Sequence, residues 1–127
     1  MIKETYCSYE VAKLLKEKGF HEPCIATYNS TTKNFQVEEI YEDWTIHWKG
    51  YISAPTQQMA MAWLREEKNI FIVIEPHTYD YVNEKNKSCV CSLWVGDNYY
   101  EYIESKDYPS YEDAVEAALK YCLENVI

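Results

Sequence analysis

The sequence predicts a single α+β domain that spans residues 1–127. The length of 127 residues suits one domain. An apolar fraction of 47% and a charged fraction of 26% exclude a disordered, collagen-like or coiled-coil chain. Three capped amphipathic segments predict helices, and several alternating or wholly apolar stretches predict strands. We expect a mixed, mostly antiparallel sheet of five to seven strands with three helices, in the order α-β-β-β-α-β-β-β-β-α.

The clearest local pattern predicts a helix that begins after Ser8 and ends before Gly19. The Ser8 hydroxyl can accept a hydrogen bond from the first turn, and the apolar residues of the helix are Val11, Leu14 and Leu15. Gly19 can adopt the left-handed conformation that ends a helix, so that Phe20 folds back on Leu15 in a Schellman motif.

Three strands are expected after this helix. Cys24–Asn29 and Phe35–Glu39 flank a polar five-residue link, a pattern that predicts a hairpin. Residues 44–48 then alternate between large apolar and polar side chains. This alternation predicts a strand with one aromatic face.

A second helix is expected with Pro55 at its first position, where the missing N–H is tolerated. Asn69 can end it in the left-handed conformation. The expected apolar stripe is Met59, Ala60, Trp63 and Leu64. Ile70–Ile74 follows and is apolar on both faces, which is typical of a central strand covered on both sides. If the strands before and after this helix share a sheet, the crossover is right-handed.

The remaining elements are expected after Pro76, which should end the central strand. Residues 79–82 form a weak strand candidate, and Ser88–Val95 pairs with Tyr99–Ile103 through a turn at 96–98. Ser110 can cap the last helix. Its expected buried stripe is Tyr111, Ala114, Val115, Ala118, Tyr121 and Cys122. We expect the last two helices to pack on one face of the sheet.

The charge balance argues against nucleic acid and anionic membranes as partners. The chain has 12 basic and 21 acidic residues and a net charge of −9. Phosphate binding needs clustered lysine and arginine, and Arg65 is the single arginine of the sequence. The longest strongly apolar run, Ile70–Ile74, is far shorter than the roughly 20 residues of a membrane span. The first residues lack an apolar leader, so we expect no export.

The five cysteines predict reduced thiols in the cytoplasm. Their number is odd, and no secretory signal precedes them. Cys89-x-Cys91 lacks the two-residue spacing of zinc and redox sites, so all five are expected to pack as small apolar groups. The sequence also lacks a phosphate-binding glycine loop and a nucleophile elbow. We therefore assign no catalytic residue, no metal ligand and no cofactor.

Two groups of residues leave room for a small enzyme or a small-molecule binder. His21 lies three residues from Cys24 and could activate its thiol as a nucleophile. Glu38, Glu39, Glu42 and Asp43 could bind a divalent cation through their oxygens. However, this Glu38–Asp43 cluster lacks the glycine and ligand periodicity of a calcium loop, so a solvated acidic rim is the preferred interpretation.

The aromatic content points to a binding surface. Thirteen Tyr, four Trp and three Phe make up 16% of the chain, more than a domain of this size can bury with every hydroxyl satisfied. Exposed tyrosine is favoured at protein interfaces, although cross-strand tyrosine pairs can also simply stabilise a sheet. The candidate interaction surface consists of Tyr79, Tyr81, Tyr99, Tyr100, Tyr102, Glu112, Asp113 and Glu116.

The leading functional hypothesis is therefore a non-catalytic interaction protein. It would bind a protein partner or a second copy of itself, as a homodimer, through an aromatic and acidic surface. A mimic of nucleic acid is a weaker alternative, because the 12 basic residues offset much of the acidic charge. Its phosphate-like carboxylates would be Glu101, Glu104, Asp107, Glu112, Asp113 and Glu116.

Three segments together resemble a known family. They are Cys7–Phe20 (CSYEVAKLLKEKGF), Ala54–Glu66 (APTQQMAMAWLRE) and Ser110–Glu124 (SYEDAVEAALKYCLE). They resemble small uncharacterised proteins of Bacteroides and of the phages and prophages of those bacteria. The resemblance covers the three expected helices and implies a small intracellular protein, compatible with an origin in a mobile element. It implies no activity, cofactor or catalytic residue.

Overall fold

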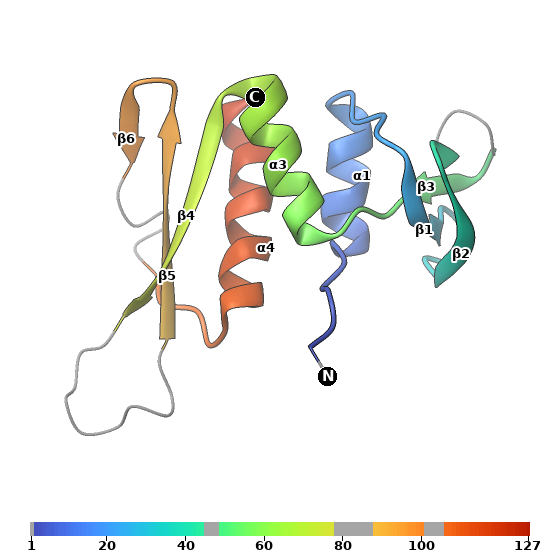
Figure 1. The fold of residues 1–127 in the computed structure, drawn as a ribbon, viewed down its shortest axis with the longest axis horizontal. Coiled ribbons are helices and arrows are strands. Elements are labelled where there is room, and N and C mark those ends of the chain that lie inside the picture. Colours follow the sequence, from blue (N-terminus) through green and yellow to red (C-terminus); the bar gives the residue numbers. More distant parts are fainter. Residues whose placement is uncertain (1, 45–48, 78–87, 101–105) are drawn as a thin grey trace.

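The computed structural model describes residues 2–44, 49–77, 88–100 and 106–127. It has the α+β class, and its three helices and described strands agree with the predicted numbers. The elements are α1 (Tyr9–Glu17), β1 (Cys24–Asn29), β2 (Phe35–Glu42), β3 (Tyr51–Ser53), α3 (Gln57–Lys68), β4 (Ile70–His77), β5 (Ser88–Val95), β6 (Asn98–Tyr100), α4 (Tyr111–Tyr121) and a π-helical extension, η2 (Cys122–Val126) (Figure 1).

The strands form two separate antiparallel sheets, with the orders β2-β1-β3 and β4-β5-β6. The prediction of one mixed sheet is therefore wrong. The order of the described elements, α-β-β-β-α-β-β-β-α followed by η2, also differs from the predicted order. Helix α3 joins β3 of one sheet to β4 of the other, so it makes no crossover within a sheet. The pairs β1-β2, β4-β5 and β5-β6 join strands that are consecutive along the chain. Strand β3 instead pairs with β1 on the side opposite β2, so the connection from β2 to β3 crosses β1.

The three helices lie between the two sheets (Figure 1). Helices α3 and α4 contact the β4-β5-β6 sheet, as predicted for the last two helices, while α1 contacts β3 and α4. One hydrophobic core joins these layers, and fully buried side chains come from all three helices and from both sheets. Examples are Leu15, Cys24, Leu64, Leu93 and Leu119.

The helix ends follow local sequence signals closely. The Ser8 hydroxyl accepts a hydrogen bond from the Val11 N–H at 3.2 Å. Gly19 has a φ of 94°, and the Phe20 N–H donates to the Leu15 carbonyl at 2.9 Å, so the predicted Schellman motif is confirmed. Asn69 ends α3 in the left-handed region with a φ of 54°, also as predicted.

Helix α3 begins two residues later than expected. Thr56 is its N-cap, with its hydroxyl accepting from the Met59 N–H at 3.1 Å, and Gln57 is the first helical residue. Pro55 lies outside the helix, so its predicted place at the first position is wrong. The Thr56 hydroxyl satisfies an N–H of the first turn, which proline cannot do.

The apolar strand β4 lies at an edge of its sheet, and β5 is central. The predicted central position of Ile70–Ile74 is therefore wrong, and Phe71 is 46% exposed rather than covered. The strand also continues through Pro76 to His77. Proline lacks the N–H that a central strand needs, but an edge strand tolerates it because one side of the ladder is open.

Several other expectations need correction or fall outside the described residues. Trp44 is helical, so the strand predicted at 44–48 does not begin there, and residues 45–48 are not described. The third strand is Tyr51–Ser53 instead. Tyr111 is 41% exposed and does not belong to the buried stripe of α4. The predicted strand at 79–82 and residues 101–103 of the predicted Tyr99–Ile103 strand also lie outside the described residues.

Candidate functional site

Three aromatic side chains form a row across the β4-β5-β6 sheet. The strand register pairs Phe71 with Trp94 and Trp94 with Tyr99. Side chains of directly paired residues share a face of a sheet, so these three lie side by side. The rings of Trp94 and Tyr99 are in contact, with centroids 4.9 Å apart. We refer to Phe71, Trp94 and Tyr99 as the aromatic row.

The aromatic row faces away from the helices. The strand neighbours of Phe71 and Trp94, which point to the opposite face, are Ile70 and Leu93, and both are buried in the core beneath α3 and α4. Phe71, Trp94 and Tyr99 are 46%, 42% and 46% exposed. Large aromatic side chains on adjacent strands, each about half exposed, make a patch of the kind that marks an interaction site.

Two exposed carboxylates belong to the strand and the turn that carry the aromatic row. Glu75 follows Phe71 by four residues on β4 and therefore points to the same face, and Asp97 lies in the turn between β5 and β6. Both are exposed. The outer face of this sheet thus combines aromatic surface with negative charge.

The predicted interaction residues divide between the outer face, other surfaces and segments that are not described. Tyr99 belongs to the aromatic row. Tyr100 is 50% exposed but pairs with Leu93 and so points toward the opposite face. Tyr79, Tyr81 and Tyr102 lie outside the described residues.

Sequence reasoning missed Phe71 and Trp94. The apolar pattern of Ile70–Ile74 predicts a covered strand for Phe71, and the predicted interaction surface does not include Trp94. The hairpin between β5 and β6 held a usable signal, because a short turn at Gly96-Asp97 sets Trp94 opposite Tyr99. No local pattern could place β4 beside β5 in the register that adds Phe71.

The predicted acidic residues lie on α4, away from the aromatic row. Helix α4 packs on the inner face of the β4-β5-β6 sheet, whereas the row is on the outer face. Glu112 and Asp113 are exposed in the first turn. Glu116 is half-buried, and its carboxylate accepts hydrogen bonds from the Ser8 N–H at 2.9 Å and the Gln57 Nε2 at 3.1 Å. Its role in the structure is to join α4 to the first residues of α1 and α3.

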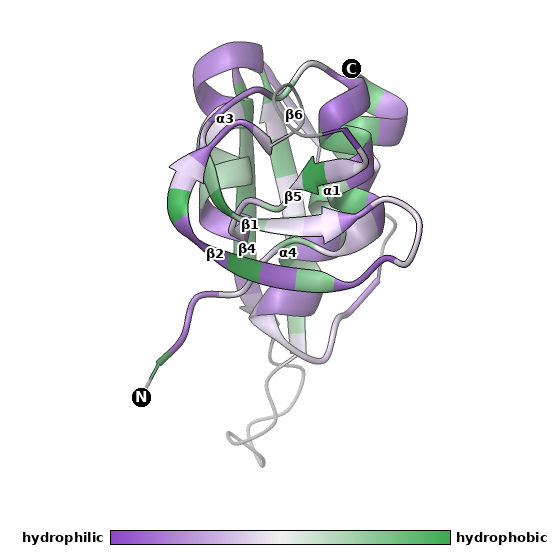
Figure 2. Cartoon of the chain, turned by 90° about the vertical axis from the view of Figure 1, so that its right-hand side faces the viewer, coloured by the Kyte–Doolittle hydropathy of each residue, from purple (hydrophilic) through white to green (hydrophobic). Residues whose placement is uncertain are grey.

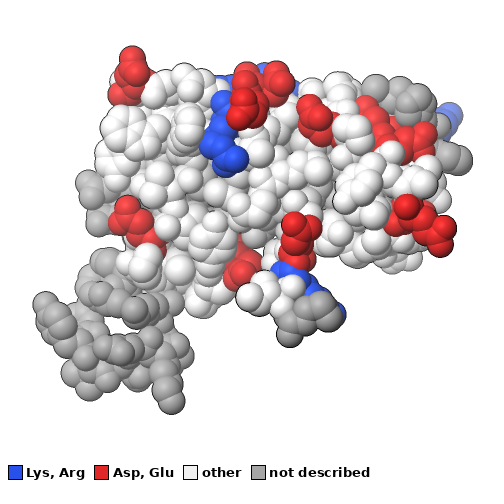
Figure 3. Space-filling model, in the orientation of Figure 1, with Lys and Arg blue, Asp and Glu red and all other residues white. Residues whose placement is uncertain are grey.

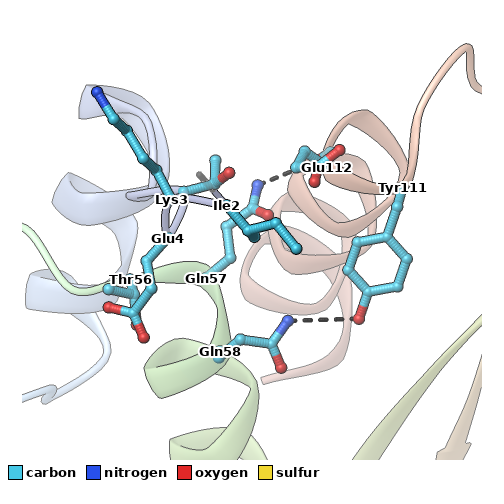
Figure 4. A pocket seen from close by; sticks show the side chains of 9 residues that line it. Ile2, Lys3, Glu4, Thr56, Gln57, Gln58, Tyr111 and Glu112 are labelled. Carbon is cyan, nitrogen blue, oxygen red and sulfur yellow. Dashed lines mark hydrogen bonds between the residues drawn. The ribbon is translucent and has the colours of Figure 1, made fainter.

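A cavity of about 240 Å³ lies beside these contacts, where α3 and α4 begin (Figure 4). The Gln57 Nε2 donates to the Glu112 carbonyl at 3.0 Å, and the Gln58 Nε2 donates to the Tyr111 hydroxyl at 3.3 Å. These amide groups already have protein partners. The cavity therefore marks the junction of two helix ends and offers no set of converging reactive groups.

The Cys24 thiol is not arranged as a nucleophile. Burial, followed by the charges of Asp43 and Glu22, raises its pKa to about 12, so the thiol is protonated at neutral pH. The Sγ atom donates to the Glu22 carbonyl at 3.4 Å, and Met59 Sδ lies 3.9 Å away. His21 Nδ1 instead lies 3.3 Å from Asp43 Oδ2. A catalytic cysteine needs a lowered pKa, and this environment has the opposite effect.

The acidic residues near the end of β2 do not converge. Glu38 accepts a long hydrogen bond of 3.5 Å from the Thr27 hydroxyl, Glu39 is exposed, and Asp43 pairs with His21. Within the four described segments, no three His, Cys, Asp or Glu side chains come together as a metal-binding set. The described geometry thus provides a spread of negative charge along a strand.

Comparison of the chain with protein-family models, curated proteins and solved structures gives no significant match. Among the described residues, no helix is both long and apolar enough to cross a lipid bilayer. The fold and the outer sheet face define the class: an α+β protein that displays an aromatic row on one of two antiparallel sheets.

Proposed function

We propose that the protein is a non-catalytic protein-interaction module and that the aromatic row is its contact surface. The observation that carries this proposal is the alignment of Phe71, Trp94 and Tyr99 on three adjacent strands, each about half exposed. Aromatic anchors of this kind are enriched among the residues that dominate binding energy at protein interfaces. A flat row on a sheet suits another protein surface better than a small ligand, which needs a concave site.

The charge of the chain favours a basic partner. Glu75 on β4 and Asp97 in the turn between β5 and β6 are exposed, and the net charge of −9 creates a field that attracts positive surfaces. An arginine or lysine of the partner can stack on the exposed indole of Trp94. Two copies of the chain would instead repel each other, so we favour a different protein over a homodimer.

Other observations support a non-catalytic role in the cytoplasm. The protonated Cys24 thiol does not favour nucleophilic catalysis. All five cysteines are free, a state that suits a reducing compartment. Membership of the Bacteroides and phage family stays a proposal that rests on the three helical segments alone.

The test uses Trp94→Ala as the disabling variant and Tyr111→Ala as its matched control. Tyr111 is 41% exposed, close to the 42% of Trp94, but it lies on α4. Proteins that the wild-type chain captures from a Bacteroides lysate would be identified and purified. Calorimetric titration would then measure the affinity of each for the wild type, for Trp94→Ala and for Tyr111→Ala. We expect Trp94→Ala to weaken binding about 30-fold, equivalent to about 2 kcal/mol, and Tyr111→Ala to change it less than twofold.

Two outcomes would overturn this proposal. One is a partner that binds the Trp94→Ala variant as tightly as the wild type, although circular dichroism shows both to be folded. The other is a homodimer, detected by light scattering, that Trp94→Ala dissociates. That result would assign the aromatic row to self-association instead.

A further inference from the structure

A second surface, on the other sheet, is open for pairing with another chain. Strand β2 lies at the edge of the β2-β1-β3 sheet, and no described residue pairs with its outer side. The Asn29 N–H donates to the Asn34 carbonyl at 2.9 Å, so this pair is of the hydrogen-bonded type. Hydrogen-bonded and non-hydrogen-bonded pairs alternate along an antiparallel ladder, so Gln36 is the next β2 residue whose backbone bonds to β1. Phe35 and Val37 belong to the non-hydrogen-bonded pairs, and their backbone N–H and C=O groups therefore point away from β1.

Strand β2 is also exposed on both of its faces. Six of its eight residues are exposed, with Val37 at 53%, Ile40 at 57% and Tyr41 at 65%. Figure 2 looks onto this end of the molecule and shows β2 crossing the front with apolar segments. Phe35–Glu42 contains neither lysine nor proline, and its charged side chains are all glutamates, so the charge that guards this edge repels acidic strands and attracts basic ones.

A hollow adjoins the open part of the edge. The register pairs Ala26 with Val37 and Cys24 with Glu42. An advance of two residues along β1 therefore corresponds to an advance of five residues along β2. This bulge takes residues 38–41 out of the regular ladder, as bulges beside binding sites often do. A hollow of about 430 Å³ lies there, lined by Gln36, Val37, Glu38, Glu39, Ile40 and Trp44.

We propose that β2 accepts an extended, basic segment of a partner protein as an added strand. The outward groups of Phe35 and Val37 would hydrogen-bond to its backbone, its apolar side chains would cover Val37 and Ile40, and its lysine or arginine side chains would reach Glu38 and Glu39. Figure 3 shows acidic side chains at this end of the molecule. Charge selects the occupant, because a second copy would set the β2 glutamates against one another.

This surface is separate from the aromatic row, so either proposal can fail without the other. Amide chemical shifts of the ¹⁵N-labelled full chain would be followed by NMR during titration with a capped decapeptide that alternates lysine with valine. A decapeptide that alternates glutamate with valine is the control. We expect saturable shifts of the Phe35 and Val37 amides with the basic peptide only.

Two substitutions of Val37 distinguish the loss of backbone hydrogen bonds to the peptide from a loss of the fold. Val37→Pro removes an outward N–H but leaves the bonds of Gln36 to β1 in place, whereas Val37→Thr keeps the N–H. We expect Val37→Pro to weaken binding at least tenfold and Val37→Thr less than threefold. The double variant Glu38→Gln/Glu39→Gln should also weaken binding about tenfold, and it serves as the deciding variant if Val37→Pro does not fold.

The proposal is overturned if the basic peptide shifts no β2 amide, or if both peptides bind equally. Unchanged binding by a folded Val37→Pro protein, or by the double glutamate variant, would also contradict it. Concentration-dependent shifts of β2 in the absence of peptide would assign the edge to a second copy of the chain.

Discussion

Burial changes the chemistry of the cysteine side chains. Cys7, Cys24, Cys91 and Cys122 are each at most 1% exposed. Burial, with a smaller contribution from Cys91, raises the pKa of the Cys122 thiol to about 12, and the pKa of Cys7 also rises well above its ordinary value. At neutral pH the thiols of Cys7, Cys24 and Cys122 are uncharged, and all four side chains pack as apolar groups of the core.

This burial predicts a loss of stability at alkaline pH. Unfolded thiols ionise above about pH 8.5, whereas folded Cys24 and Cys122 hold their protons to about pH 12. The contribution of these two thiols to the free energy of unfolding is therefore complete below the pKa of the unfolded chain. It is lost as the pH rises toward their pKa in the folded protein. Urea unfolding between pH 7 and about pH 9.5 should show the free energy falling by up to about 1.4 kcal/mol per pH unit for each thiol. Cys24→Ala should reduce this slope, and an unchanged slope would contradict the explanation.

At the scale of elements, one carboxylate holds three helices together. Glu116 of α4 accepts from the backbone of Ser8, the N-cap of α1, and from the side chain of Gln57, the first residue of α3. Figure 1 shows these three helices beginning at the same end of the molecule. Helix N-termini carry partial positive charge, so the position of Glu116 is also electrostatically favourable.

Removing this carboxylate should destabilise the fold. Glu116→Ala leaves the Ser8 N–H without its acceptor, and it leaves the amide of Gln57, which is 3% exposed, with its bond to the Glu112 carbonyl alone. We expect a loss of about 2–3 kcal/mol in the free energy of urea unfolding. Glu112→Ala, one turn earlier and exposed, should lose less than about 1 kcal/mol, the contribution of the helix dipole. Equal losses in the two variants would show that the hydrogen bonds of Glu116 contribute nothing specific.

At the scale of the whole molecule, the helices couple two sheets that do not pair with each other. Helix α1 contacts β3 and α4, and α4 contacts β4 and β5, so both sheets share one core. A shared core links the unfolding of one sheet to that of the other.

We therefore expect one cooperative unfolding transition. Far-UV circular dichroism and tryptophan fluorescence should give the same midpoint, since Trp44 lies near one sheet and Trp94 belongs to the other. Leu119→Ala, at a fully buried position of α4, should lower stability by about 2–5 kcal/mol and move both signals together. Ile2→Ala, at a fully exposed position, is the control. Two separate transitions would indicate that the sheets belong to independent units.

The sequence by itself determined the features that depend on a few neighbouring residues. The caps at Ser8 and Ser110, the left-handed ends at Gly19 and Asn69 and the hairpin between β1 and β2 all follow from hydrogen bonds or conformations within one turn. The tyrosine content likewise pointed to exposed aromatic surface, and Tyr99 is exposed.

Only the tertiary structure decided how the strands are divided and which faces stay open. An apolar segment such as Ile70–Ile74 has the same pattern whether it becomes a central strand or an edge strand, because partners distant in sequence make that choice. The exposure of Phe71 and Trp94, the position of Glu116 between helices and the open edge of β2 depend on the same long-range packing. Hydrophobic burial is non-directional, so the local sequence supplies the apolar faces, and the assembled chain determines which of them are covered.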